Sequence, residues 1–306
     1  MHSNLINNYN QSQDLSVISF MFSRMYDYLQ KGHAMENLFD IKDKRIVITG
    51  GAGVLCGTLA RYLARSGAKV CIVDCDVFRA DKLAKEIEAE GNFAISVQAN
   101  VLEKDTIQEA CVCAGDTMGG IDVLINGAGG NKKEATTSEN LSFFDMPTEA
   151  IRWVFDLNFI GTLLPSQVFG KYMAEHGKGL ILNVSSMSAF SPLTKVGNYS
   201  AAKAAVNNFT EWLAVHMCQN YSTDIRVNAI APGFFLTNQN RFLLTDEKTD
   251  ELTPRGKTII DHTPMGRFGD PEELCGTVQW LISEASKFVT GTVIPVDGGF
   301  NAFGGV

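Results

Sequence analysis

Short apolar runs alternate with longer amphipathic stretches from residue 45 to the end of the chain. Runs rich in Val and Ile favour strands, and apolar residues three or four positions apart favour helices. Strands are predicted at 45–49, 69–74, 93–99, 123–126, 180–185, 225–230 and 292–296, with helices between most of them. This alternation is typical of βαβ units around a parallel sheet. It predicts an α/β fold, a single doubly wound, Rossmann-like domain with a seven-stranded parallel sheet and helices on both faces.

Two long segments, 127–147 and 231–270, do not fit the alternation. Structureless loops of this length are uncommon unless they are functional, and ligands of such sheets bind beyond the carboxyl ends of the strands. Both segments follow a predicted strand at that end. We therefore expect them to be the substrate loops, the second acting as a lid.

The first 34 residues differ from the rest, because they begin with Asn, Gln and Ser and contain no Lys or Arg before Arg24. A secretory signal needs a basic start and a longer apolar centre. Residues 1–34 are therefore predicted to be a poorly ordered N-terminal extension, with a docking helix or a misassigned start before Met35 as alternatives. Residues 35–306 are predicted to form the single domain.

The composition narrows the class of partner. A net charge of −8 and a pI near 5.2 argue against nucleic-acid and anionic-membrane surfaces, which need basic patches. No apolar run approaches the ~18 residues that span a bilayer. The seven cysteines show no spacing typical of zinc sites, which predicts reduced thiols, no metal and a cytoplasmic protein.

A glycine-rich turn, Gly50-Gly51-Ala52-Gly53-Val54-Leu55, follows the first predicted strand and precedes a helix expected to start near Thr58. Glycines let the backbone approach a pyrophosphate, whose charge the helix start stabilises. Asp74 ends the next strand, 24 residues after Gly50, where it can accept hydrogen bonds from ribose hydroxyls. A 2′-phosphate would meet this carboxylate, so NAD is favoured over NADP.

Tyr199 and Lys203 stand four residues apart in a stretch of small residues that favours a helix. This spacing places both side chains on one helix face. A tyrosine loses its proton near pH ~10, and a cation beside it favours the phenolate. The pair is therefore a candidate for proton transfer, although the same spacing also occurs on solvated helix faces.

Several ordered motifs together resemble the short-chain dehydrogenase/reductase family, from about residue 40 to the end of the chain. The family's Thr-Gly-x-x-x-Gly-x-Gly matches at Thr49 and Gly50 but has Val54 and Cys56 at the later glycines. Its Asn-Asn-Ala-Gly motif reads Asn126-Gly127-Ala128-Gly129 here. The resemblance implies a set of cofactor-binding residues: Gly50, Gly51, Gly53, Val54, Leu55, Asp74, Asn100, Val101, Asn126, Ala128, Gly129, Tyr199, Lys203, Pro232, Gly233 and Thr237.

The same resemblance implies four catalytic residues, Asn158, Ser186, Tyr199 and Lys203, with Ser186 at the family spacing of 13 residues before Tyr199. Tyr199 would exchange a proton with the substrate oxygen while NAD(H) exchanges a hydride with its carbon. Lys203 would lower the pKa of the phenol and bind the nicotinamide ribose. Ser186 would orient the carbonyl, and Asn158 would hold a water that relays protons.

Within the family, the segments 238–244, 252–257, 262–268 and 298–306 are similar to the D-mannonate oxidoreductases, also called fructuronate reductases. The likeness implies a small-molecule sugar-acid substrate and, by analogy, a homotetramer. Candidate substrate contacts are cations and amides of the two loops: Lys132, Lys133, Arg241, Arg255, Lys257, Asn131, Asn238 and Gln239. The alternatives are a polyol, sorbose or gluconate dehydrogenase, and a catalytically silent dinucleotide-sensing protein.

Overall fold

The computed structural model describes residues 37–236, 244–246, 249 and 251–305. The chain divides into two units, Met1–Leu38 and Phe39–Val306, and the second contains the whole sheet. The extension expected at 1–34 lies outside the described residues, so its character stays a prediction.

Seven parallel strands form one sheet in the order β3-β2-β1-β4-β5-β6-β7. They are β1 (Arg45–Thr49), β2 (Lys69–Asp74), β3 (Ala94–Gln98), β4 (Val123–Asn126), β5 (Gly179–Val184), β6 (Ile225–Pro232) and β7 (Val293–Val296). The predicted α/β fold is confirmed, and the strand limits move by at most two residues. The strand order reverses between β1 and β4, which is where a doubly wound sheet opens a crevice for ligands.

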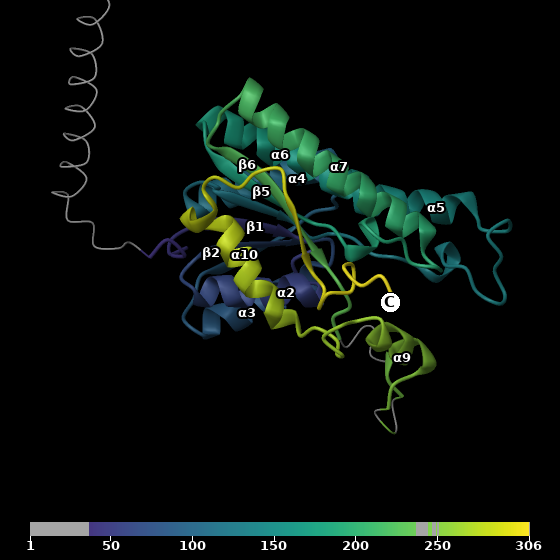
Figure 1. The fold of residues 1–306 in the computed structure, drawn as a ribbon. Coiled ribbons are helices and arrows are strands. Elements are labelled where there is room, and N and C mark those ends of the chain that lie inside the picture. Colours follow the sequence, from purple (N-terminus) through teal and green to yellow (C-terminus); the bar gives the residue numbers. More distant parts are fainter. Residues whose placement is uncertain (1–36, 237–243, 247–248, 250, 306) are drawn as a thin grey trace, which may run out of the picture. The chain divides into compact units, whose positions relative to one another are not determined.

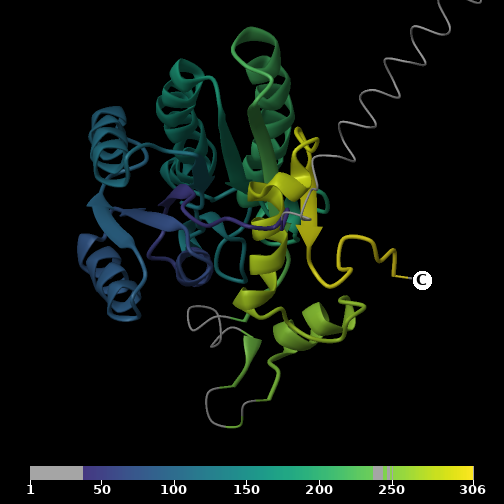
Figure 2. The same ribbon diagram turned by 90° about the vertical axis from the view of Figure 1, so that its left-hand side faces the viewer.

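Helices cover both faces of the sheet (Figures 1 and 2). One face carries α2 (Val54–Arg65), α3 (Val77–Ala89) and α10 (Cys275–Ile282), and the other carries α4 (Lys104–Met118), α6 (Gly161–His176) and α7 (Gly197–Asn220). Successive residues of a strand face the two helix layers in turn. In β1, Ile46 and Ile48 face the α2 layer and Val47 faces the α4 layer, as the two-residue period of a strand requires.

A π-helical turn, η2 (Asp156–Ile160), joins α5 (Thr148–Phe155) to α6 and so makes one long helix with a bulge in it. Short 3-10 turns complete the chain: η1 (Lys133–Ala135), η3 (Met187–Ala189), η4 (Pro271–Leu274) and η5 (Glu284–Ser286). The seven cysteines are free, and four of them are buried, as the composition predicts.

The expectation that both long segments lack structure is wrong. Segment 231–270 contains the end of β6 and the helix α9 (Pro254–Asp261), which Thr253 caps and Pro254 starts. Segment 127–147 contains η1 and a bridge between Ser138 and Leu141. Capping signals inside a long loop are weak beside the strong period of the neighbouring strands, so the sequence pattern does not predict α9.

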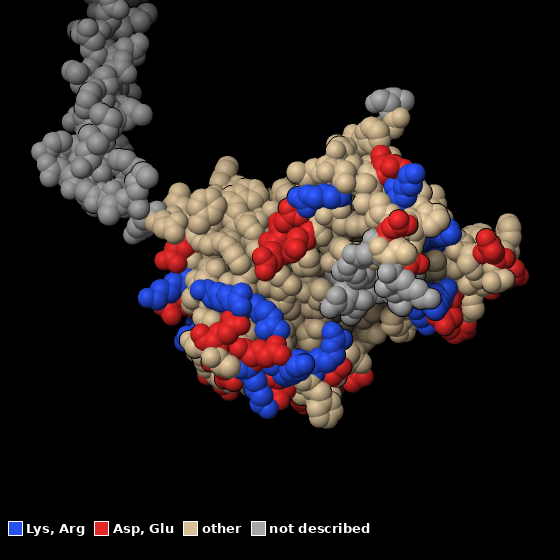
Figure 3. All heavy atoms as spheres, turned by 90° about the horizontal axis from the view of Figure 1, so that it is seen from below, with Lys and Arg blue, Asp and Glu red and all other residues tan. Residues whose placement is uncertain are grey.

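Acidic and basic side chains are interspersed on the face seen in Figure 3. Between α2 and α3, Arg61 pairs with Glu86 and Arg65 with Glu90. In the part of the chain that the structure describes, no helix is both long and apolar enough to cross a membrane.

Candidate functional site

Two glycine turns meet at the carboxyl ends of β1 and β4. Gly50 has a φ of +61°, and a Cβ on it would lie 2.7 Å from the Cα of Ala128. A Cβ on Gly51 would lie 2.8 Å from the carbonyl oxygen of Ile48. Only glycine fits either position, so the two main chains approach each other without side chains between them.

Helix α2 begins at Val54, four residues earlier than the sequence suggested. Gly53 precedes it in an extended conformation, and no side chain of the described residues caps this end. The first N–H groups of a helix need acceptors and attract negative charge. The turn therefore fits a pyrophosphate, as predicted for Gly50–Leu55.

Asp74 lies beside this turn at the end of β2. Its two carboxylate oxygens accept hydrogen bonds from the backbone N–H groups of Ala52 and Asp76, each at 3.0 Å. The guanidinium of Arg79 donates to the carbonyl of Ala52 at 2.9 Å. The carboxylate is thus fixed against the glycine turn, where the predicted ribose contact requires it.

The next two predicted cofactor residues use their side chains elsewhere. The Asn126 amide is buried and donates to Ser166 and Asn183, both at 2.9 Å. The Asn100 amide accepts from the N–H of Leu102 and donates to Glu103. Only the main chain of Asn126 can face a cofactor, because burial in the core decides where its amide points.

The bulge of η2 places Asn158 against the turn after β4. Its Nδ2 donates to the carbonyl oxygens of Gly130 and Val154 at 2.7 Å, and its Oδ1 accepts from the N–H of Gly130 at 3.1 Å. A Cβ on Gly129 would lie 2.8 Å from this Oδ1 and 3.2 Å from the Nζ of Lys203. Asn158 and Lys203 therefore both lie against the glycine turn at Gly129.

Lys203 is buried at 4% exposure, and its Nζ donates to the carbonyl oxygen of Val184 at 2.8 Å. Burial lowers its pKa from the usual 10.5 to about 8. The Nζ lies 5.8 Å from the ring centroid of Tyr199 on the same helix, α7. The helical spacing thus brings the two side chains together as predicted.

The hydroxyl of Ser186, which follows β5, lies next to the phenol of Tyr199. Burial raises the pKa of the phenol, and hydrogen bonding from Ser186 lowers it to a smaller extent. The expectation that Lys203 holds the pKa of Tyr199 below its usual value is therefore corrected, because desolvation by Ala135, Ala150 and Val154 dominates among the protein's own groups.

The side of the site that is expected to hold the substrate is made by segments far apart in sequence. A small apolar cluster joins Met187, Leu244, Ile259 of α9 and Phe300. The ring of His262 lies 4.6 Å from that of Phe300 and 5.1 Å from that of Phe303. The C-terminal tail, residues 297–305, therefore packs against the end of α9.

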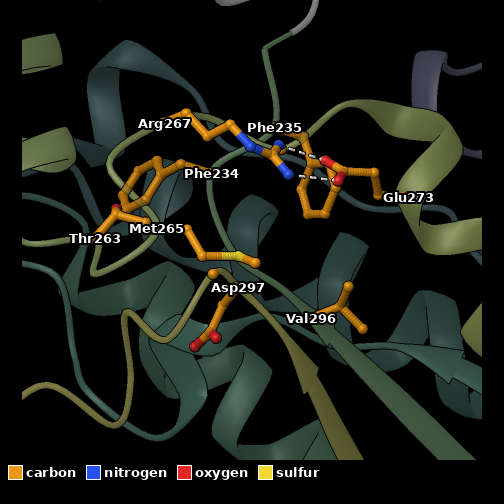
Figure 4. A pocket seen from close by; sticks show the side chains of 10 residues that line it. Phe234, Phe235, Thr263, Met265, Arg267, Glu273, Val296 and Asp297 are labelled. Carbon is orange, nitrogen blue, oxygen red and sulfur yellow. Dashed lines mark hydrogen bonds and ion pairs between the residues drawn. The ribbon is translucent and has the colours of Figure 1, made fainter.

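A cavity of about 220 Å³ lies beside the end of β6, between the tail and the 263–269 segment (Figure 4). Phe234, Met265 and Asp297 line it, and Arg267 pairs with Glu273 at its rim. A Cβ on Gly233 would lie 2.7 Å from the Cα of Asp297. Pro232 and Gly233 thus bring β6 against the tail, whereas Thr237 lies outside the described residues.

Within the described ranges, no group of three or more His, Cys, Asp or Glu side chains could hold a metal ion. The polar groups of the cleft are instead a phenol, an ammonium, an amide and hydroxyls. These groups bind and move protons, and they can hydrogen-bond a carbonyl or hydroxyl substrate.

Residues 54–301 match the family model described as enoyl-(acyl carrier protein) reductase. One relative is the protein named "Uncharacterized oxidoreductase UxuB" of Bacillus subtilis (strain 168). It is 49% identical, and the match covers 87% of this chain and 98% of that protein. The chain belongs to the short-chain dehydrogenase/reductase family.

Two further relatives of this oxidoreductase family carry more specific names. The 5-keto-D-gluconate 5-reductase of Escherichia coli (strain K12) is 34% identical, over 87% of this chain and 98% of that protein. A crystal structure of a candidate D-mannonate oxidoreductase from Haemophilus influenza, with bound NAD, is 47% identical, with a TM-score of 0.82 over 87% of this chain and 98% of that one.

The departures from the short-chain dehydrogenase/reductase motifs compensate for each other. Cys56 stands where the family has a glycine, and Gly127 stands where it has an asparagine. A Cβ on Gly127 would lie only 2.1 Å from the Sγ of Cys56. The sulfur thus fills the space that a side chain at position 127 would need.

Sequence reasoning missed several members of the site. Ser188 is buried against Ser186, and Gly130 holds both polar ends of the Asn158 amide. Phe300 belongs to the apolar cluster with Met187, Leu244 and Ile259. A serine two positions after Ser186 was visible in the sequence, but its contact with Ser186 depends on the turn η3.

Proposed function

We propose that the protein is an NAD-dependent oxidoreductase that interconverts keto and hydroxy sugar acids, with D-fructuronate and NADH giving D-mannonate and NAD. The observation that carries the proposal is the juxtaposition of the Tyr199 phenol, the Ser186 hydroxyl and the buried ammonium of Lys203. A proton donor and a second hydroxyl at one point of a cleft suit the oxygen of a carbonyl that is being reduced.

Three features support NAD as the cofactor. The glycine turn and the uncapped start of α2 suit a pyrophosphate, and the fixed carboxylate of Asp74 suits ribose hydroxyls better than a 2′-phosphate. When bound, NADH would supply the hydride. The bound NAD of the Haemophilus relative agrees with this choice.

The chain's own residues would handle the proton. Tyr199 donates its proton to the carbonyl oxygen as negative charge develops there, and Ser186 donates a hydrogen bond to the same oxygen. Lys203, held by Val184, places a positive charge near the phenolate that remains. Asn158 fixes the turn at Gly130 and so the floor of the cleft.

A sugar acid also needs a cation for its carboxylate. In the sequence, Lys132 stands between Gly130 and Ala135. Gly130 contacts Asn158, and Ala135 packs against Tyr199. Its Nζ lies 4.9 Å from the ring centroid of Trp153, and none of the described carboxylates pairs with it. Lys132 is therefore our candidate for the carboxylate ligand, and the named sugar-acid relatives support this substrate class.

The decisive experiment measures NADH consumption with D-fructuronate, D-tagaturonate, 5-keto-D-gluconate and L-sorbose, and repeats each assay with NADPH. We expect D-fructuronate with NADH to give the highest kcat/KM. A higher kcat/KM for 5-keto-D-gluconate or L-sorbose would show that D-fructuronate is not the preferred substrate. NADH binding without any turnover would indicate a dinucleotide sensor. Tyr199→Phe should lower kcat by about 10²- to 10⁴-fold.

Lys132→Met separates sugar acids from neutral sugars. Loss of the ammonium should raise KM for the preferred sugar acid about tenfold, as expected for one charged hydrogen bond, and leave KM for L-sorbose unchanged. Lys133→Met, an exposed neighbour, is the matched control. An equal rise for both substrates would show that Lys132 does not bind the carboxylate.

We also propose that the enzyme acts in the cytoplasm as a homo-oligomer that pairs through α6 and α7. A groove of about 730 Å³ runs between these helices, and Trp212, Val215 and Tyr221 are more than half exposed beside it. In a two-fold interface the same surface of both subunits meets, so it must carry both a groove and the side chains that fill it. The groove between α6 and α7 and the exposed side chains beside it meet this requirement. Trp212→Glu should lower the mass measured by light scattering, and an unchanged mass would refute this interface.

A further inference from the structure

Ser188 lies two residues beyond Ser186, in the turn η3, and its side chain is 1% exposed. Its hydroxyl lies 3.0 Å from the Oγ of Ser186, and its backbone N lies 3.2 Å from the same atom. Ser188 thus presents two hydrogen-bond donors to one oxygen. Among the described residues, Ser186 is the partner of the Ser188 hydroxyl.

A serine hydroxyl has one hydrogen to donate and two lone pairs to accept with. The N–H and O–H of Ser188 occupy both lone pairs of Ser186. The Ser186 hydroxyl then has no lone pair left to accept with, so it can only donate its hydrogen. The phenol of Tyr199 is the group that Ser186 contacts on its other side. The arrangement therefore orients the hydroxyl toward the place where a substrate oxygen would lie.

The third serine of this stretch behaves differently. Ser185 is anchored to α7, where it hydrogen-bonds Asn207 and the carbonyl oxygen of Lys203. Among the described residues, its hydroxyl bonds these two partners and not Ser186, so it does not set the direction of the Ser186 hydroxyl. Adjacent serines thus hold the helix and the catalytic hydroxyl separately.

We propose that Ser188 is a positioning residue that holds Ser186 as an obligatory hydrogen-bond donor to the reacting oxygen, an inference that rests on the proposed carbonyl reduction. Donors that are oriented before the reaction stabilise developing charge without further reorganisation. Without Ser188, the Ser186 hydroxyl can rotate and turn a lone pair toward the oxygen.

The test is a double-mutant cycle with Ser188→Ala, Ser186→Ala and the double variant, measured as kcat for carbonyl reduction at saturating NADH. Ser188→Ala should lower kcat about tenfold with KM changed less than twofold, because the lost orientation matters in the transition state. In the Ser186→Ala background the same change should have less than a twofold effect. Two results would overturn the proposal: an unchanged kcat in Ser188→Ala, or an equal loss in both backgrounds.

Packing is separated from hydrogen bonding by two variants of nearly equal shape, Ser188→Thr and Ser188→Val. Thr keeps the hydroxyl and should retain kcat within about threefold, whereas Val should resemble Ser188→Ala. Equal kcat values for Thr and Val would contradict the proposal. Ser286→Ala, which removes a buried hydroxyl that donates to the carbonyl oxygens of Leu281 and Ser283, controls for loss of stability alone.

A readout without substrate distinguishes failure of this inference from failure of the proposed function. The ¹³Cζ resonance of labelled Tyr199, assigned with Tyr199→Phe, reports hydrogen bonding to the phenol at neutral pH. Ser188→Ala should shift it in the same direction as Ser186→Ala, and the double variant should add nothing. A resonance that moves in Ser186→Ala but not in Ser188→Ala would refute the role of Ser188 even if no carbonyl were turned over.

Discussion

The two sides of the cleft are built in different ways. On the glycine-turn side, formed by Gly50–Val54 and Gly127–Gly129, main chains touch each other and added atoms have no room. On the tail side, formed by Met187, α9 and residues 297–305, side chains from three distant segments hold one another. The first side should therefore be sensitive to adding atoms, and the second to removing them.

Lys203 lies against the glycine-turn side, with its Nζ 3.2 Å from where a Cβ on Gly129 would lie, and its loss should give the largest effect on activity. Lys203→Met should lower kcat by about 10²-fold or more, because the phenolate loses its cation. It should also stabilise the protein by about 1–3 kcal/mol at pH 7, because burial of the ammonium disfavours its charged form. Kinetics and urea unfolding at the same pH measure the two effects.

The pH dependence of that gain follows from the pKa of Lys203. The folded pKa is about 8, below the usual 10.5, so between these values the unfolded chain binds more protons than the folded one. The stability of the wild type therefore rises across this window. The advantage of Lys203→Met should be complete below pH 8 and vanish toward 10.5; a gain that persisted there would contradict the burial argument.

Gly127→Ala tests the glycine-turn side. The added Cβ would lie 2.1 Å from the Sγ of Cys56 and 2.9 Å from the carbonyl oxygen of Thr49. We expect a loss of about 2–3 kcal/mol in the free energy of unfolding, as for other overpacked sites. Cys56→Ala in the same chain should recover about half of it, because the Thr49 contact remains.

Gly276→Ala is the matched control for this substitution. A Cβ at Gly276, on α10, meets no atom within 4 Å. Alanine is the better helix former, so this variant should be neutral or stabilised by up to about 1 kcal/mol. Equal destabilisation by Gly127→Ala and Gly276→Ala would show that crowding against Cys56 is not the cause.

Phe300→Ala tests the tail side and should have the smallest effect. The ring of Phe300 lies 5.2 Å from that of Phe234 and 4.6 Å from that of His262. Its removal should release the tail from α9 and raise KM for the substrate about tenfold, the effect of losing ~1.4 kcal/mol. The Kd of NADH should change less than twofold, as measured by calorimetry. Phe288→Ala, at a fully exposed ring, is the control. A larger change in the Kd of NADH than in the KM for the substrate would show that the tail side is not specific to substrate binding.

The sequence determined the sheet, its seven strands, the glycine turn, Asp74 and the Tyr199–Lys203 pair. These features depend on the period of a strand, the period of a helix and turn chemistry, all of which act between neighbours in the chain. The family motifs then singled out Ser186 and Asn158 as candidates. In the structure Ser186 lies beside Tyr199, and Asn158 and Lys203 both lie against Gly129.

Only the tertiary structure decided how distant residues share space. It placed the sulfur of Cys56 where a side chain at Gly127 would lie, turned the amide of Asn126 into the core and set Ser188 against Ser186. It also reversed the expected direction of the Tyr199 pKa, because burial is a property of the packed molecule. Contacts and desolvation of this kind arise between segments that no local pattern connects.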